Sequence, residues 1–137
     1  MRLWHKDLIP YLPRQQLLGQ WRELCCIAKN IYANGTPNHL LVNKVIKYVD
    51  MEFTQYARQV YLTMLYRGYT PNWDNFMKYR ETPYVELPMD DIFVGWHNDR
   101  YFWQCYYNLQ EKYDCGGLTD EEWGVIVDSV NVCIKEL

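Results

Sequence analysis

Long hydrophobic runs are missing from this 137-residue sequence. No window approaches the 18 consecutive apolar residues of a membrane span, and the N-terminus has neither an uninterrupted apolar stretch nor a small-residue cleavage site. These absences argue against a membrane-spanning helix and against a signal peptide. We therefore expect an intracellular, cytoplasmic protein whose hydrophobic residues, 49% of the total, build one folded core.

Metal-binding and common catalytic spacings are missing as well. The five cysteines are Cys25, Cys26, Cys105, Cys115 and Cys133, and the three histidines are His5, His39 and His97. No C-x-x-C or H-x-x-x-H pair exists, so no local zinc site is indicated, and no G-x-S-x-G or phosphate-loop motif is present. We expect reduced, buried thiols and a protein that works without a metal or organic cofactor.

Basic residues are scarce in the second half of the chain. Residues 81–137 hold 3 of the 14 Lys and Arg but 12 of the 17 Asp and Glu, a net charge of −9. Residues 1–80 hold the other 11 bases and 5 acids, a net charge of +6, which the overall charge of −3 conceals. The first half is therefore a candidate surface for nucleic-acid phosphates. The alternative is that these charges only solvate the surface.

Four amphipathic segments predict an all-α fold. They run from just after Pro13 to about Ala33, from about Asp50 to Arg67, from about Asn98 to Asp114, and from Thr119 to the C-terminus. Proline at a start, Asn-Gly and Gly68 at ends, and a Thr119–Glu122 capping box support these limits. We expect a single compact domain, residues 1–137, of about four helices. The aromatic-rich connection 70–97 should be ordered and pack on the body, whereas 42–49 reads equally as strand or helix.

The first predicted helix has one polar face that contains an acid between bases. At about 100° per residue, its core-facing arc holds Leu17, Leu18, Trp21, Leu24, Cys25 and Ala28. The opposite arc holds Gln15, Gln16, Gly19, Gln20, Arg22, Glu23, Cys26 and Lys29. Glu23 lies near the middle, and Gly19, one turn earlier, leaves space beside its carboxylate. This face is either a pocket floor or an ordinary solvated surface with a tolerated glycine, and the pattern alone favours the second.

Several short motifs resemble one protein family. They are Met1-Arg2-Leu3-Trp4, the segment Leu17-Leu18-Gly19-Gln20-Trp21-Arg22-Glu23-Leu24, Tyr66-Arg67-Gly68-Tyr69 and Asn108-Leu109-Gln110-Glu111-Lys112. Together they span about three quarters of the chain. The sequence resembles the pyrimidine-dimer DNA glycosylase/AP lyases of the endonuclease V type, and an arginine directly after the N-terminal residue followed about 20 residues later by Arg-Glu is the most specific part of the likeness.

The resemblance implies a mechanism and a set of site residues. The nucleophile would be the α-amine of Met1, which attacks the sugar of a damaged pyrimidine nucleotide, and Glu23 would be the assisting acid or base. α-Amines as a class titrate near pH 7.7–8.0 and so supply a neutral fraction at pH 7. The residues expected to contact DNA are Arg2, Gln15, Arg22, Lys29 and His39. The partner would be duplex DNA with a damaged or modified base, with no membrane and no obligatory protein partner.

Two other functions fit the sequence. One is a catalytically silent, DNA-binding relative of the same fold. The other is a protein-interaction module that uses the acidic, amphipathic C-terminal segment 119–137. Reductive trapping on abasic DNA separates the enzyme from the first, and salt-dependent DNA affinity argues against the second.

Overall fold

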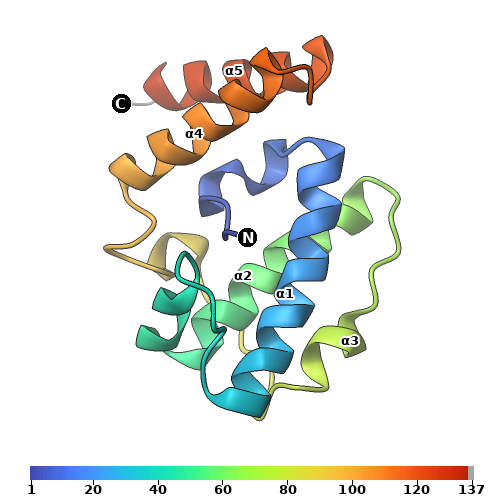
Figure 1. The fold of residues 1–137 in the computed structure, drawn as a ribbon, viewed down its shortest axis with the longest axis vertical. Coiled ribbons are helices and arrows are strands. Elements are labelled where there is room, and N and C mark those ends of the chain that lie inside the picture. The colour runs from blue at the N-terminus through green and yellow to red at the C-terminus, as the bar shows by residue number, and fades with distance from the viewer. Residues whose placement is uncertain (136–137) are drawn as a thin grey trace.

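Helices and loops account for all of residues 1–135, the part of the chain that the computed structural model describes, with side chains as far as Asn131 (Figure 1). The α-helices are α1 (Arg14–Asn34), α2 (Asp50–Tyr66), α3 (Trp73–Met77), α4 (Asp99–Asp114) and α5 (Asp120–Lys135). Three 3₁₀ helices accompany them: η1 (Lys6–Tyr11), η2 (Asn43–Lys47) and η3 (Met89–Asp91). The all-α prediction is confirmed.

The four predicted helices occur with ends close to those expected, because local capping chemistry sets them. Gly35 closes α1 with a left-handed φ of 76° and donates its N–H to the Ile31 carbonyl at 2.8 Å. The capping box before α5 is reciprocal: Glu122 N donates to Thr119 Oγ1 at 3.1 Å, and Thr119 N donates to Glu122 Oε1 at 3.0 Å. Short-range signals were therefore sufficient to position these ends.

The connection between α2 and α4 is ordered and packs on the body, as expected. It contains the short helices α3 and η3, which the sequence did not indicate. Phe76, Ile92 and Phe93 within it are fully buried in the main core. Gln55 of α2 fixes the middle of the connection, since its Oε1 accepts hydrogen bonds from Tyr84 Oη and Leu87 N, both at 3.0 Å. The ambiguous segment 42–49 is neither strand nor α-helix but mainly the 3₁₀ helix η2.

The helices form two layers with the start of the chain between them (Figure 1). Helices α1 and α2 pack together in one layer, and α4 and α5 pair in the other. The N-terminus lies at the centre of the view, where hydrogen bonds join it to α1 on one side and to α4 on the other. One continuous apolar cluster, which includes Leu3, Leu17 and Tyr56, unites the layers into a single compact domain.

The expectation of buried thiols was wrong for most of the cysteines. Cys25, Cys26, Cys105 and Cys115 are free, as expected, but only Cys105 is buried, and Cys26 and Cys115 are exposed. Cys26 lies on the outer face of α1 and Cys115 at the end of α4, where neither meets a second layer. The side chain of Cys133 lies outside the described part. Among the described helices, none combines the length and apolarity that a bilayer crossing needs.

Candidate active site

The first residues of the chain are held in an extended conformation by the side chain of Gln20. Gln20 lies on α1 and is 1% exposed. Its Oε1 accepts the N–H of Trp4 at 2.8 Å, and its Nε2 donates to the carbonyl of Arg2 at 3.0 Å. A glutamine that both accepts from and donates to the backbone acts like a neighbouring strand, so it fixes the position of this segment.

Two tyrosines hold the same segment from other helices. Tyr56 of α2 is fully buried, and its Oη lies 2.5 Å from the Trp4 carbonyl and 3.0 Å from Gln20 Oε1, so one hydroxyl proton serves both acceptors. Tyr101 of α4 donates its hydroxyl proton to the Leu3 carbonyl. Burial raises the pKa of Tyr56 and of Tyr101 well above the usual tyrosine value, so both remain donors at neutral pH.

Glu23 lies next to this anchored segment. The Nε2 of Gln20 that contacts the Arg2 carbonyl also lies 3.3 Å from Glu23 Oε2. Glu23 is half-buried, one turn after Gln20 on α1. The negative charge of Glu23 also contributes to the raised pKa of Tyr56. One amide group thus connects the carbonyl of Arg2, the residue after Met1, to the carboxylate of Glu23.

The guanidinium of Arg2 turns into the molecule rather than into free solvent. It lies 5.4 Å from the ring centre of Trp4, and its Nη1 is 3.9 Å from the sulfur of Cys105. Arg2 also lines a hollow of about 290 Å³ together with Leu41, Tyr101 and Gln104. A phosphate or sugar that enters this hollow would therefore meet a fixed positive charge beside the start of the chain.

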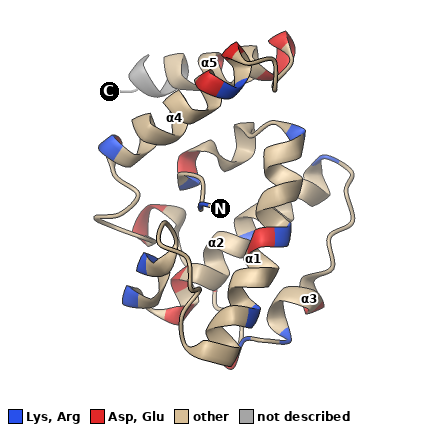
Figure 2. Ribbon diagram, viewed as in Figure 1, with Lys and Arg blue, Asp and Glu red and all other residues tan. Residues whose placement is uncertain are grey.

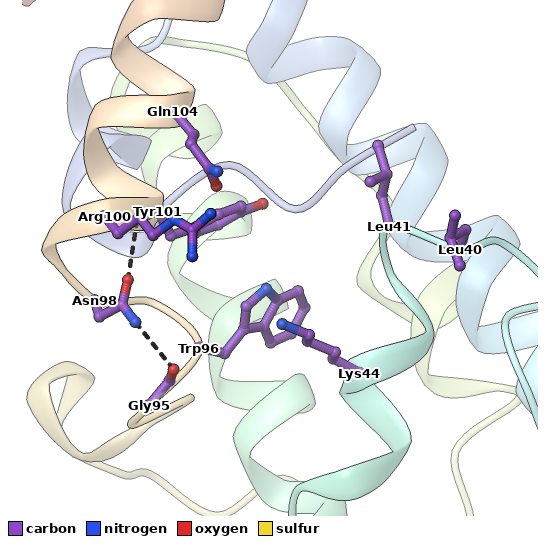
Figure 3. Close-up of a pocket in the computed structure, with 9 residues that line it drawn as sticks. All are labelled: Leu40, Leu41, Lys44, Gly95, Trp96, Asn98, Arg100, Tyr101 and Gln104. Atoms are coloured by element: carbon purple, nitrogen blue, oxygen red, sulfur yellow. Dashed lines mark hydrogen bonds between the residues drawn. The ribbon is translucent and has the colours of Figure 1, made fainter.

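A second hollow, of about 330 Å³, adjoins the first because both are lined by Leu41, Tyr101 and Gln104 (Figure 3). One wall carries Leu40, Leu41 and Lys44 from the segment after α1, and the other carries Trp96, Arg100 and Tyr101. Lys44 and Arg100 approach the space from opposite walls in Figure 3. We name the two hollows together the N-terminal cleft. It offers apolar, aromatic and cationic groups, a combination that suits nucleotides.

The sequence has a basic first half and an acidic second half, but the folded protein does not separate positive and negative charge along the same boundary (Figure 2). Arg2 and Lys44 come from the basic half, but Arg100 comes from the acidic half and reaches the same cleft. No acidic residue is among the described residues that line either hollow. The positive surface is therefore assembled by the fold rather than by one stretch of sequence.

The predicted DNA-contacting residues of α1 form an exposed row. Gln15, Arg22 and Lys29 are exposed and recur every seven residues, which separates neighbours by about 10 Å along the helix. Gln15 lies beside the turn between α4 and α5, where it lines a separate hollow with Gly117. The row thus passes Glu23 at its centre but extends well beyond the N-terminal cleft.

His39 lies outside the lining of the cleft, although the next residues, Leu40 and Leu41, belong to it. Its backbone N–H donates to Asn43 Oδ1 at 2.9 Å, and its ring is half-buried. The Nδ1 atom has no hydrogen-bond partner among the described residues. The structure therefore brings His39 to the rim of the site but not into contact with Glu23 or Arg2.

Gly19 has open space around it. A β-carbon there would meet only Arg22 Nη2, at 3.7 Å, which is an ordinary contact distance. No other element of the protein requires a glycine at this position. Alanine would stabilise the helix by about 1 kcal/mol, so the packing within the described residues does not explain the glycine.

A buried histidine pair lies beneath the N-terminal segment. The rings of His5 and His97 are 5.2 Å apart, and the Lys6 N–H donates to His97 Nδ1 at 3.0 Å. The ammonium of Lys6 donates to the Ile92 carbonyl at 2.7 Å. Burial, with the nearby His5 and Lys6 charges, lowers the pKa of His97 to about 2, and burial lowers the pKa of His5. Both rings are therefore neutral and serve as packing and hydrogen-bonding groups.

The sequence reasoning missed the residues that position the site. Gln20 was placed on the polar, outward arc of the helix, and the structure shows instead that it is buried against Trp4 and Tyr56. The helical projection misassigned it because the N-terminal segment covers that flank of α1. Tyr56 and Tyr101 gave no signal, since an aromatic residue on an amphipathic helix normally indicates core.

Comparison with protein-family models identifies a family. The sequence model of a family described as "Pyrimidine dimer DNA glycosylase" matches residues 1–77, which is more than half of the chain. The matched range includes the anchored N-terminal segment, Gln20, Glu23 and Tyr56, and it stops before Arg100 and Tyr101. No curated protein and no solved structure gives a significant match.

Proposed function

Because the chain belongs to the pyrimidine dimer DNA glycosylase family, we propose that it excises a damaged or modified pyrimidine from duplex DNA through an imine formed by its own N-terminal amine. Met1 supplies the nucleophilic nitrogen and Glu23 the assisting carboxylate. Because this chemistry acts on DNA, we further propose that the protein works inside the cell. The same intermediate would make the enzyme an AP lyase.

The proposed reaction uses one nucleophile in two stages. The lone pair of the neutral Met1 amine attacks C1′ of the damaged nucleotide, and the N-glycosidic bond breaks as the base leaves with the bonding electrons and takes up a proton. Opening of the sugar ring gives an imine between the amine and C1′. Removal of a proton from C2′ then expels the 3′ phosphate by β-elimination. Glu23 balances the positive charge at the sugar and accepts the transferred protons.

One observation carries this proposal: the Gln20 amide contacts both the Arg2 carbonyl, at 3.0 Å, and the Glu23 carboxylate, at 3.3 Å. The backbone of the second residue and the carboxylate therefore lie within a few ångströms of one atom. We infer that the amine, one residue earlier in the chain, shares a substrate with Glu23. Pre-organisation of this kind is what nucleophilic catalysis needs, because small misplacements of reacting groups reduce rates strongly.

The proposed DNA contacts follow from the exposed basic and polar side chains of the protein around the site. Arg22 and Lys29 on α1 would bind phosphates along the duplex, with Gln15 at the far end of the same row. Arg2 would meet a phosphate inside the N-terminal cleft, and His39 would do so at its rim. With these contacts the target nucleotide would lie between α1 and the cleft.

Reductive trapping tests the nucleophile. Protein with a free N-terminus is mixed with abasic-site DNA and borohydride, which adds hydride to the imine and leaves a stable secondary amine. Peptide mass mapping should find the adduct on the peptide that begins with Met1. Acetylation of the N-terminus should eliminate trapping while phosphate-driven binding persists. An adduct on Lys6 or Lys29, or full activity of an acetylated protein, would contradict the proposed mechanism.

The two rival functions make different predictions in the same assays. A silent DNA-binding relative would bind damaged duplex but form no adduct. An interaction module built on α5 would show no salt-dependent affinity for DNA. For the proposed enzyme, Arg22→Ala should weaken binding to every duplex and reduce the log–log salt slope by about one unit. An unchanged slope would show that Arg22 does not contact phosphate.

A further inference from the structure

The turn after α1 presents two leucines to solvent at the mouth of the N-terminal cleft. Leu40 is 86% exposed and Leu41 50% exposed, and both line the cleft (Figure 3). Isolated exposed leucines are common and need no explanation. These two differ because they are adjacent, lie on the wall of the cleft and belong to a segment that is otherwise fixed to the body.

The turn is rigid although its tip is exposed. The His39 carbonyl accepts hydrogen bonds from Val42 N at 3.1 Å and from Asn43 N at 2.9 Å, and Asn43 Oδ1 accepts the His39 N–H at 2.9 Å. Asn38 takes the left-handed conformation, with φ of 58°. Val42 is fully buried and anchors the turn in the core. Leu40 is consequently held out from the surface and cannot fold back onto it.

Cations flank the exposed leucines. Lys44, four residues after Leu40 and within η2, shares its wall, and Arg100 lies on the opposite wall. Arg2 lines the part of the cleft that Leu41 also lines. No carboxylate is among the described lining residues. An apolar tip between positive charges complements a ligand with an apolar interior and a negatively charged exterior. Duplex DNA is such a ligand, because its stacked bases lie between two phosphate backbones.

We propose that Leu40, supported by Leu41, is a wedge that enters the base stack of duplex DNA next to the target nucleotide. The leucine side chain would replace part of the stacking that is lost, while Lys44 and Arg100 bind the flanking phosphates. Insertion would open the duplex so that the C1′ atom becomes accessible from the cleft. The inference rests on the proposed function for its choice of duplex DNA, but it requires no catalysis.

A fluorescent base analogue tests the wedge directly. The probe is a duplex with a non-cleavable tetrahydrofuran abasic analogue and 2-aminopurine as the neighbouring base, since 2-aminopurine brightens when it is unstacked. Wild-type protein at saturation should raise the fluorescence. Leu40→Ala should lose most of that rise and bind about tenfold more weakly, because the apolar contact is removed. Leu40→Met should retain the rise, because it keeps an apolar side chain of similar size.

Ile46→Ala is the matched control, since Ile46 is 49% exposed in the same segment but lines a different hollow. It should behave as wild type. Thermal unfolding of Leu40→Ala should be unchanged because Leu40 has almost no intramolecular contact to lose. A full fluorescence rise with saturating Leu40→Ala, or DNA binding by wild type without any rise, would overturn the wedge alone. Failure of the wild type to bind this duplex would overturn both the wedge and the proposed function. A fluorescence rise on this duplex, together with no base excision from duplexes that carry damaged pyrimidines, would leave the wedge and reject the glycosylase.

Discussion

The two ends of the chain attach to the protein in opposite ways. At the N-terminus, side chains bind the backbone itself: the buried Gln20 and Tyr56 and the half-buried Tyr101 reach the peptide groups of residues 2–4. Helix α5 instead rests on α4 through aromatic faces, with Trp123 stacked on Tyr113 at a ring distance of 5.4 Å. The N-terminal segment is thus positioned by hydrogen bonds that are buried or partly buried, whereas the hydrogen bonds that hold α5, from Tyr113 Oη to Asp120 and from Arg14 N to Glu122, are exposed.

This difference indicates where the protein needs precision. A hydrogen bond to a peptide group fixes both distance and direction, whereas stacked rings tolerate sliding. Loss of one partner from a buried hydrogen bond also costs stability, because the remaining polar group is left without a partner. Two buried polar side chains and one half-buried one hold the first residues in place, as the proposed chemistry requires, while α5 covers the other side of the fold. The following changes test that contrast.

The largest effect should come from Glu23→Gln. It removes the charge and proton acceptor beside the anchored N-terminus, so single-turnover excision should fall about 10²–10⁴-fold, while unfolding and most DNA binding remain normal. Glu121→Gln makes the same chemical change on the exposed surface of α5 and should leave excision unchanged. Near-normal excision by Glu23→Gln would remove this carboxylate from the mechanism.

Gln20→Ala should have the next largest effect. It leaves the buried Trp4 N–H without its acceptor and releases the Arg2 carbonyl, so the free energy of unfolding should fall by about 2–4 kcal/mol. Excision by folded molecules should fall about 10–100-fold because the amine is misplaced. Gln55→Ala is the control, since Gln55 is equally buried but holds the 84–87 connection. Equal excision by the two variants at matched folded fraction would show that Gln20 is only structural.

A smaller effect should appear on acidification, and in stability rather than in chemistry. His97 is neutral in the fold, with its pKa lowered to about 2, whereas a histidine in the unfolded chain titrates near 6.5. Below pH 6.5 the unfolded state takes up a proton that folded His97 does not, so stability is present above that pH and is lost as pH falls. From pH 7 to pH 5 the loss should be about 2 kcal/mol per histidine, measured by urea unfolding. His97→Asn should flatten this dependence, and an unchanged slope would show that His97 is protonated in the folded protein.

The smallest effect on excision should come from Trp123→Ala in α5. Loss of its stacking on Tyr113 and of its tilted ring contact with Tyr106 should lower the free energy of unfolding by about 1–3 kcal/mol. Excision at temperatures where the variant is folded should equal that of wild type, because none of the α5 side chains described, up to Asn131, lines the N-terminal cleft. A drop in excision beyond the loss of folded protein would mean that α5 belongs to the site and that the contrast between the two ends is wrong.

Sequence alone predicted what depends on near neighbours. The helix ends at Gly35 and Asn98 and the capping box of Thr119 and Glu122 lie within a few residues of the bonds they make. The family likeness likewise rested on short motifs at the start of the chain, and the family match includes that region. The short helices η1, η2 and α3 escaped prediction because they are too brief to show a hydrophobic period.

Contacts between residues far apart in the chain were decided only by the tertiary structure. Tyr101 reaches the Leu3 carbonyl and His97 accepts the Lys6 N–H across more than 90 residues. The polar face of α1 looked solvent-exposed around Gln20 until the N-terminal segment covered it. Helix caps and hydrophobic periodicity depend on residues that lie within one or two helical turns of each other. Helix positions can therefore be predicted from the sequence alone. A cleft and a buried polar network exist only once separate helices pack, because packing decides which polar group loses water and must find a partner.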